Sequence, residues 1–315
     1  MRRAGDKVLI ALADPERPAI EVTPAQALQS VDDARAHGVL PIIVRKIGPL
    51  LPDSMRAELQ REAGERIGLM LHLRTIGAKV ADRVAGGLQA VVVKGPDLAD
   101  NAYRLRGDRT FGDLDILAAP EAHAALAELL GGLGYQLYLR PRLDHTESNQ
   151  EQKWFHPGIP SVLVEVHGNL VHYQALRRRV SFGYAEVRRG GAQSPALARF
   201  FTCVIHATLG HKLHELRLLV DVLQTFRQLD DADFTALPGM ARELGVSLET
   251  ALCLRLVGAL FTIEPAAEMA LRIENKPSVF TRLIDGESLL EFPRSGVAVV
   301  RHHLFRAYQY LVPRR

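Results

Sequence analysis

The sequence predicts a small α/β or α+β core enclosed between two helical regions. Short β-branched runs alternate with helical patterns between residues 88 and 171, whereas apolar residues recur at helical spacing before and after that stretch. The chain has 315 residues, of which 47% are hydrophobic and 24% charged, as in an ordinary globular protein with a substantial core. We expect an N-terminal helical region over residues 1–87, the core over residues 88–193 and a C-terminal helical region over residues 194–315.

Charge, cysteine content and hydropathy exclude several classes of protein. The formal net charge is +3, which is too mild for a protein whose main activity is wrapping nucleic acid. The two cysteines form no CxxC, so they support neither a disulfide framework nor a thiolate metal site. No apolar run reaches the roughly 18 residues of a membrane span, and the first run is too short for a signal peptide. We therefore expect a cytoplasmic protein with no membrane partner.

The first region is predicted to be helical. Thr23 followed by proline is typical of a helix cap and its first-turn residue. The pattern over residues 52–83 predicts one long helix or two, and we expect this stretch to end at the glycine pair Gly86-Gly87.

The core is predicted to alternate strands and helices, and helices then dominate to the C-terminus. Strands are expected over residues 88–93, 113–118, 135–140 and 161–171, and helices over residues 96–106 and 120–134. From residue 194 we expect five or six helices. No flexible linker separates the parts, so the helices should pack directly on the sheet.

A pattern of acidic residues in the core predicts a metal site. Asp113 and Asp115 are two positions apart on one predicted strand, so both side chains project from the same face. Carboxylates that close raise each other's pKa unless a cation lies between them. In LVEVH, Glu165 shares a face with His167, and it would add a third carboxylate if the two strands are neighbours. Such hard oxygen ligands favour Mg²⁺ or Mn²⁺ and chemistry on a nucleoside triphosphate.

Positive charge for phosphate groups is available beside these carboxylates. Lys94 and Arg109 flank the predicted helix between the first two strands. The backbone amides after Gly95 would add an anion site, although Pro96 removes one donor. A lone DxD often marks a solvated strand end, so the order of the motifs carries more weight than the DxD itself.

That order of motifs, KG, RxxGDxDxL and then ExH, resembles the DNA polymerase beta-like nucleotidyltransferase superfamily, and within it a large group of bacterial nucleotidyltransferase-family proteins. ARAHGVLPIIVRKI and CVIHATLGHKL with RLLVDVLQ are similar to helical parts of that group, so the resemblance covers most of residues 25–230. It implies an α+β fold with a small mixed sheet flanked by N-terminal and C-terminal helices. It also implies transfer of a nucleoside monophosphate from an NTP, ATP by default, to a hydroxyl with loss of pyrophosphate.

The resemblance implies roles residue by residue. It makes Asp113 and Asp115 the catalytic metal ligands for Mg²⁺ or Mn²⁺, with Glu165 as the third carboxylate. Gly95 is followed by Pro96 where most of the superfamily has a second small residue, so triphosphate contacts in that loop depart from the usual pattern. The nucleotide-binding residues on this interpretation are Lys94, Gly95, Arg109 and Gly112.

Two further residues are possible accessories to the site. His167 is open as a metal ligand, an acceptor-side base or a partner that orients Glu165. Asp221 follows LRLLV on a predicted buried face, so it needs a partner, which is a histidine, the sheet or a substrate. Nearby histidines also leave a zinc site conceivable, namely His206, His211 and His214.

The acceptor and two rival functions stay open. A protein, a peptide, a small molecule and an RNA end are all compatible acceptors; the arginine run Arg177–Arg179 makes nucleic acid possible, yet a charge run is more often a solvated face. One alternative is a catalytically silent nucleotide-binding regulator, or a toxin-antitoxin or biosynthetic partner on the same fold. The other is a phosphotransferase that moves the γ-phosphate with the same carboxylates.

Overall fold

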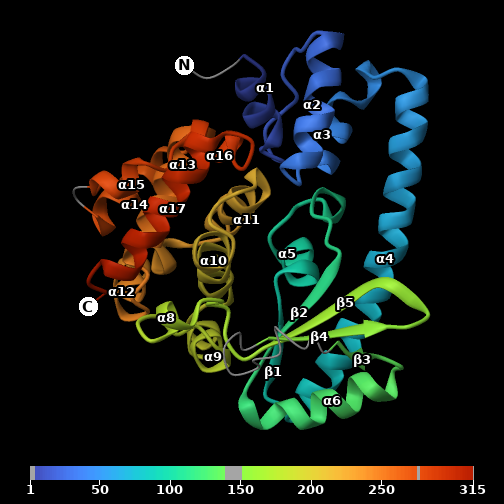
Figure 1. Cartoon of the computed structure of the whole chain (residues 1–315), viewed down its shortest axis with the longest axis vertical. Coiled ribbons are helices and arrows are strands. Elements are labelled where there is room, and N and C mark those ends of the chain that lie inside the picture. The colour runs from blue at the N-terminus through green and yellow to red at the C-terminus, as the bar shows by residue number, and fades with distance from the viewer. Residues whose placement is uncertain (1–3, 139–150, 275–276, 315) are drawn as a thin grey trace.

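The computed structural model describes residues 4–138, 151–274 and 277–314. Figure 1 shows the sheet with its helices at lower right, the first three helices above it, and the C-terminal helices on the other side. Helices precede the sheet, namely α1 (Ala4–Ala13), α2 (Pro24–Ala36), α3 (Leu40–Ile47), η1 (Gly48–Leu50) and α4 (Asp53–Ala85).

The predicted helix signals of the first region are confirmed. Thr23 caps α2: its side chain accepts a hydrogen bond from the backbone of Gln26, and the Gln26 side chain accepts one from the backbone of Thr23. Helix α4 is a single helix of 33 residues that ends before Gly86, and Gly87 adopts a φ of +100°, which glycine tolerates without strain. Helix α1 was not predicted.

The sheet is mixed, which confirms the α+β class. Its strands lie in the order β1-β2-β5-β4-β3; β2 and β5 run parallel, and the other neighbouring pairs run antiparallel. The strands are β1 (Ala90–Val93), β2 (Asp113–Ala118), β3 (Gln136–Leu137), β4 (Glu151–His156) and β5 (Ile159–His167). Between them lie α5 (Gly95–Asn101), η2 (Arg106–Asp108), η3 (Pro120–Ala122) and α6 (His123–Gly132).

The structure differs from the expected elements at several places in the core. The strand expected over residues 161–171 is β5, which begins at Ile159 and ends at His167. The helix expected over residues 96–106 ends at Asn101, so α5 is shorter than predicted. The strand expected over residues 135–140 is described only as far as β3, and residues 139–140 lie outside the described residues. Strand β4 was not predicted, because EQKWFH carries only a weak apolar alternation.

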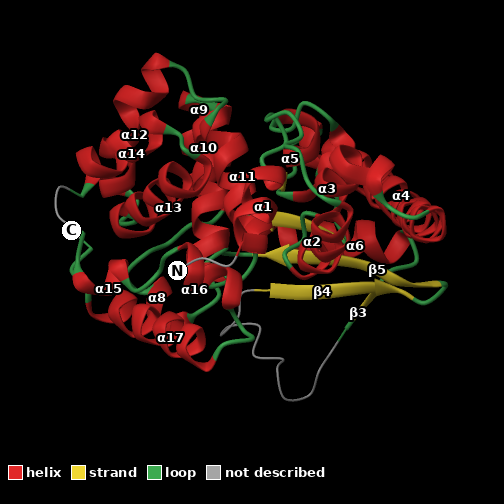
Figure 2. Cartoon of the chain, turned by 90° about the horizontal axis from the view of Figure 1, so that it is seen from above, coloured by secondary structure: helices red, strands yellow, loops and turns green. Residues whose placement is uncertain are grey.

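Helices α4 and α6 cover one face of the sheet. Leu114 of β2 and Val164 of β5 share a hydrophobic cluster with Leu73 of α4 and Leu126 of α6. Figure 2 shows these two helices beside the strands, with the C-terminal helices on the opposite side of the molecule. Because side chains alternate along a strand, the residues on either side of Leu114 in β2 and of Val164 in β5 point to the other face, toward the C-terminal helices.

The C-terminal region contains more helices than the five or six expected. Within the described residues, eight α-helices follow residue 194, several of them short. The elements from β5 onward are α8 (Gln174–Arg177), α9 (Tyr184–Gln193), α10 (Pro195–Ile205), the π-helical segment η4 (His206–Gly210), α11 (Leu216–Phe226), α12 (Asp231–Glu243), α13 (Ser247–Phe261), α14 (Glu264–Ile273), α15 (Val279–Arg282), α16 (Gly286–Glu291) and α17 (Gly296–Leu311).

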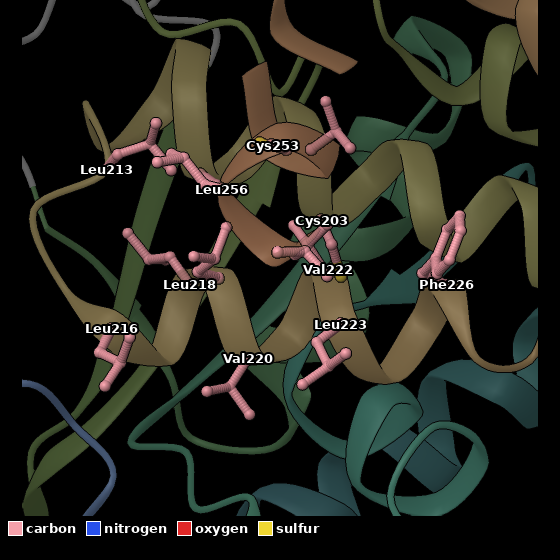
Figure 3. Packing of buried hydrophobic residues seen from close by; sticks show 14 of the residues in the cluster. Cys203, Leu213, Leu216, Leu218, Val220, Val222, Leu223, Phe226, Cys253 and Leu256 are labelled. Atoms are coloured by element: carbon pink, nitrogen blue, oxygen red, sulfur yellow. The ribbon is translucent and has the colours of Figure 1, made fainter. Parts of the chain in front are cut away.

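Helix α11 lies at the centre of the larger hydrophobic core. Figure 3 shows Leu218 and Val222 of α11 among Cys203 of α10 and Leu256 of α13. The same cluster reaches Leu117 on the sheet, so the helices pack directly on it, as expected. Among the described residues, no helix is both long enough and apolar enough to cross a membrane.

Candidate active site

The acidic residues of β2 and β5 meet on the face of the sheet that is turned away from α4. Asp115 lies opposite Glu165 in the parallel register of the two strands, and Asp113 is two residues earlier on β2. The neighbouring Leu114 is fully buried on the other face. The prediction that these two strands are neighbours is therefore confirmed, and it follows from their alternation that the acidic side chains share one face.

Two cations of the chain bind the central carboxylate. The Nζ atom of Lys94 lies 2.6 Å from Oδ1 of Asp115, and Nε2 of His167 lies 2.8 Å from the same oxygen. His167 is also 3.5 Å from Oε2 of Glu165. The side chains of Asp115, Glu165 and His167 bring one ligand atom each to within 4.8 Å of one another.

The backbone at Lys94 is unusual in a way that serves this contact. Lys94 lies between β1 and α5 with a φ of 58°, a region that residues other than glycine rarely adopt. Such a conformation costs about 1–3 kcal/mol and persists where surrounding structure holds it. Val93 pairs with Asp115 across the sheet, so the strained residue sits at the strand end nearest that carboxylate. The ammonium group is buried with it.

Strand β4 adds a fourth acid and a second lysine to the same face. Lys153 lies opposite Glu165 in the antiparallel register, and Glu151 lies opposite His167. The Nζ atom of Lys153 is 2.7 Å from Glu165 and 2.8 Å from Glu151, so it bridges the two carboxylates. Unlike Lys94, this lysine side chain is 47% exposed. We call Asp113, Asp115, Glu151 and Glu165, with Lys94, Lys153 and His167, the carboxylate cluster.

The charges in the carboxylate cluster shift the pKa of its central pair in opposite directions. Burial alone would raise the pKa of Asp115, but the ammonium of Lys94 and the hydrogen bond from His167 lower it. Burial opposes the charged form of His167, yet its bonds to Asp115 and Glu165 raise its pKa to about 9. At neutral pH the pair is therefore an imidazolium that donates to a carboxylate.

Asp113 is the carboxylate that the chain leaves without a counter-charge. Burial and the nearby charge of Asp115 raise the pKa of Asp113. No described residue forms a hydrogen bond or an ion pair with its side chain. Glu165 behaves in the opposite way: burial opposes ionisation, but the hydrogen bond from His167 lowers its pKa to about 2. An uncompensated carboxylate beside ionised ones is a feature of sites that bind a cationic ligand.

The structure pairs Arg109 with helix α11 and not with the carboxylates of β2 and β5. Its guanidinium binds both oxygens of Asp221 on α11, with Nε–Oδ1 at 2.7 Å and Nη2–Oδ2 at 2.9 Å. Tyr103 donates a third hydrogen bond, 2.6 Å long, to the same carboxylate. Arg109 and Asp221 are each 2% exposed. The partner that Asp221 required is thus Arg109 with Tyr103, and the pair joins the segment before β2 to α11.

The two predicted glycines lie at the edge of the site. Gly95 is buried with a φ of +25°, and a Cβ there would lie 3.5 Å from the carbonyl oxygen of Asp113. Gly112 is exposed, with open space where a side chain would be. Asp97, close to the predicted phosphate loop, forms an ion pair with Arg199 of α10 at 3.1 Å.

Several histidine rings continue from the carboxylate cluster toward α11. The rings of His167 and His172 are stacked with centroids 6.1 Å apart, and His172 lies 6.0 Å from His211. Burial and the charge of His167 lower the pKa of His172 to about 4, so this imidazole is neutral at neutral pH. His206 and His214 lie 4.4 Å and 5.3 Å from His211 by ring centroids. Those three do not converge as metal ligands among the described residues, so the structure does not support the zinc site that the sequence left conceivable.

Sequence reasoning missed three residues of this face. Glu151 and Lys153 were not identified because β4 was not predicted, and His172 lies just past the strand that supplies Glu165. The available signal was EQKWF followed by a Pro157-Gly158 turn, which is typical of a strand entering a hairpin.

The donors on this face fit a divalent cation. Two carboxylates and an imidazole have ligand atoms within 4.8 Å, and a third carboxylate, Asp113, lies beside them without a counter-ion. Lys94 already contacts Asp115, so a divalent ion would share or displace its ammonium. The donor set is therefore compatible with Mg²⁺ or Mn²⁺.

Comparison with known proteins agrees with this chemistry at the level of the family. No curated protein and no solved structure matches the chain. Residues 25–262, which run from the second residue of helix α2 to just past α13 and include the sheet, match the sequence model of a family described as "uncharacterised nucleotidyltransferase". The chain belongs to that nucleotidyltransferase family.

Proposed function

We propose that the chain is a metal-dependent nucleotidyltransferase that moves an NMP group from an NTP to a hydroxyl of an acceptor. The observation that supports it best is the in-register pairing of Asp115 with Glu165 on parallel strands, with Asp113 on the same face. Family membership points to the same reaction class. ATP is the first donor to test, and the acceptor is a protein, a peptide, a small molecule or an RNA end.

Three carboxylates would hold the catalytic metal. They are Asp113, Asp115 and Glu165, with His167 oriented by its bonds to Asp115 and Glu165. When bound, Mg²⁺ or Mn²⁺ would neutralise charge on the transferring phosphoryl group and lower the pKa of the acceptor hydroxyl. The chain itself supplies a fixed, mostly buried arrangement of these ligands, and such positioning accounts for most of the catalysis in phosphoryl transfer.

Lys94 is the cation that would meet the triphosphate. Its ammonium neutralises Asp115 in the structure, and its strained backbone holds it beside that carboxylate. With a divalent ion bound to Asp115, the Lys94 ammonium would be available for phosphate oxygens. The backbone at Gly95 and the exposed Gly112 would flank the same phosphates.

Arg109 takes a different role in this proposal. Its guanidinium is engaged by Asp221 and by the carbonyl oxygen of Thr110, so we assign the pair to positioning the segment that leads into β2 against α11. Asp221 is then a positioning residue as well.

The test is transfer of label from each α-labelled NTP to an acceptor in a cell lysate, with Mg²⁺ or Mn²⁺. Asp113→Asn should lower transfer by at least about 10³-fold, or ~4 kcal/mol, because one metal ligand is lost. Its thermal midpoint should stay unchanged or rise, because a repulsive charge is removed. Asp32→Asn, an aspartate whose side chain is 87% exposed, is the matched control and should keep full activity. A fully active Asp113→Asn protein would rule the assignment out, and label only from γ-labelled ATP would identify a phosphotransferase.

One observation favours the alternative of a catalytically silent nucleotide-binding protein. The Lys94 ammonium occupies the central carboxylate at 2.6 Å, and Pro96 removes an amide donor from the adjoining helix start. If the ammonium outcompetes the divalent ion, the chain would bind nucleotide without turnover. Nucleotide binding by calorimetry, with no pyrophosphate released, would favour this alternative.

A further inference from the structure

A second group of ligand side chains adjoins the carboxylate cluster. Glu151 of β4, His167 of β5 and His172, in the segment between β5 and α8, each bring one ligand atom to within 4.8 Å of the others. Glu151 and His167 are opposite each other in the antiparallel register of β4 and β5. The group therefore combines one carboxylate and two imidazoles, whereas the carboxylates of β2 and β5 make an oxygen-rich site.

The bonding of His167 indicates which of its nitrogens serves this second group. Nε2 is bonded to Asp115 at 2.8 Å. Nδ1 is buried and has no hydrogen-bond partner among the described residues, and the whole residue is 0% exposed. In the metal-free chain Nδ1 carries the imidazolium proton, and a buried N–H without an acceptor is unfavourable. A metal ion that binds at Nδ1 would displace that proton to solvent. Metal-bound histidines commonly donate their other ring N–H to a carboxylate, and His167 with Asp115 already has that arrangement.

His172 offers the second imidazole in a state suited to metal binding. Within the described part of the chain, neither of its ring nitrogens has a hydrogen-bond partner. Its ring is stacked on that of His167, with an interplanar angle of 8°. Tetrahedral coordination with bonds of about 2.0–2.1 Å places ligand atoms roughly 3.3 Å apart, so the three side chains need to close by up to about 1.5 Å. His172 lies outside any helix or strand, which permits that movement.

We propose that Glu151, His167 and His172 form a second metal site that binds a divalent transition metal ion of the Zn²⁺ class. Two nitrogen donors with one carboxylate suit Zn²⁺, which often takes three protein ligands and leaves a fourth position open. Mg²⁺ prefers oxygen ligands, so it should choose the three carboxylates of Asp113, Asp115 and Glu165 instead. The site goes beyond the proposed transfer reaction, because it is defined by a different metal and by Glu151 and His172, which the reaction does not require; His167 is shared between the two groups.

Lys153 is the competitor for this metal. Its ammonium is 2.8 Å from Oε1 of Glu151 and would repel a divalent ion bound to the same carboxylate. Because the side chain is 47% exposed, it can turn into solvent when the metal binds. Removing its charge should therefore tighten metal binding.

The experiment measures metal affinity, not transfer. The full chain is freed of metal with a chelator and titrated with Co²⁺, whose visible absorption reports the ligands and the geometry, and Zn²⁺ is then added in competition. We expect one equivalent of Co²⁺ with the intense absorption of a tetrahedral site that includes imidazole. His172→Gln and Glu151→Gln should each weaken binding by at least about tenfold to a hundredfold, whereas Lys153→Met should strengthen it.

Controls keep this outcome separate from the transfer proposal. His303→Gln makes the same substitution at an exposed histidine and should leave the Co²⁺ affinity unchanged. An equal loss of affinity in this variant would show that Co²⁺ binds adventitiously to surface histidines. Asp113→Asn should abolish transfer yet leave the Co²⁺ affinity within about threefold. Circular dichroism of the metal-free variants confirms that they are folded. Unchanged affinity in His172→Gln, or loss of Co²⁺ binding only in Asp113→Asn, would overturn the second site without touching the transferase assignment.

Discussion

Two buried groups of charged residues in this protein are built in opposite ways. Arg109 and Asp221 form a closed pair: both are 2% exposed, and two hydrogen bonds from the guanidinium and one from Tyr103 satisfy the carboxylate. In the carboxylate cluster, four acids face two lysines and His167, and Asp113 has no partner among the described residues. A balanced pair stabilises an arrangement of elements, whereas leftover charge is a means of binding a ligand.

The largest effect should come from opening the closed pair. Asp221→Asn leaves the guanidinium of Arg109 buried without a counter-charge, which should lower the free energy of unfolding by about 3–5 kcal/mol. Urea unfolding measures this change. The double variant Arg109→Met/Asp221→Leu should recover most of the loss, because no unpaired charge remains buried. If Asp221→Asn were as stable as the parent, the pair would not be the structural group that its geometry indicates.

In the carboxylate cluster, by contrast, activity should suffer more than stability. Glu165→Gln removes one proposed metal ligand and should lower transfer by about 10²-fold, or ~2.7 kcal/mol. Stability should also fall, because the lowered pKa of Glu165 means that its ionised form stabilises the fold. The loss should be smaller than that of Asp221→Asn, because Lys153 is half-exposed and can pair with Glu151 alone. Steady-state transfer and urea unfolding of the same preparation give the two numbers. A variant that unfolds early yet keeps its specific activity would place Glu165 among structural residues instead.

A double-mutant cycle on Lys94 and Asp115 measures their coupling free energy, which can be compared with that of the closed pair Arg109 and Asp221. Asp115→Asn strands the buried ammonium of Lys94, so it should be less stable than Lys94→Met/Asp115→Asn by about 1–2 kcal/mol. The coupling is expected to be smaller than that of Arg109 with Asp221, because a lysine contact is not bidentate. Equal coupling in the two pairs would remove the distinction drawn between them.

The smallest effect is a difference in pH dependence between Asp113 and Asp14. Burial and Asp115 raise the pKa of Asp113, so its ionised form lowers stability at neutral pH, and that penalty disappears below the unfolded value of 3.8. For Asp14, burial opposes ionisation, but two hydrogen bonds from Arg227 lower the pKa. Ionised Asp14 therefore stabilises the folded state above the unfolded pKa of 3.8, and this stabilisation is lost as the pH falls through the lowered pKa.

Asp113→Asn should therefore gain stability at pH 7 and lose that gain toward pH 3. Asp14→Asn should lose stability at pH 7, and the deficit should shrink over the same range. Chemical unfolding in the presence of a chelator, from pH 7 to pH 3, measures both slopes. Parallel slopes for the two variants would contradict the opposite pKa shifts.

Local pattern was sufficient for much of the fold and for the acidic half of the site. The spacing of Asp113 and Asp115 on a β-branched strand places both on one face, and the same period puts Glu165 with His167. Helix signals at Thr23 and the glycine pair after α4 were equally readable. These features depend on interactions between residues only a few positions apart.

The sequence pattern could not predict contacts between segments that lie far apart in the chain. Asp221 lies 112 residues from Arg109, and only the packing of α11 on the sheet makes the predicted phosphate ligand a buried structural cation. Strand β4 brings Glu151 and Lys153 to the site, but its own alternation was too weak to predict it. Residue spacing thus determined which acids share a face, because side-chain direction follows from the local backbone. The tertiary structure decided which cations neutralise them, because pairing in space depends on how far-separated segments pack.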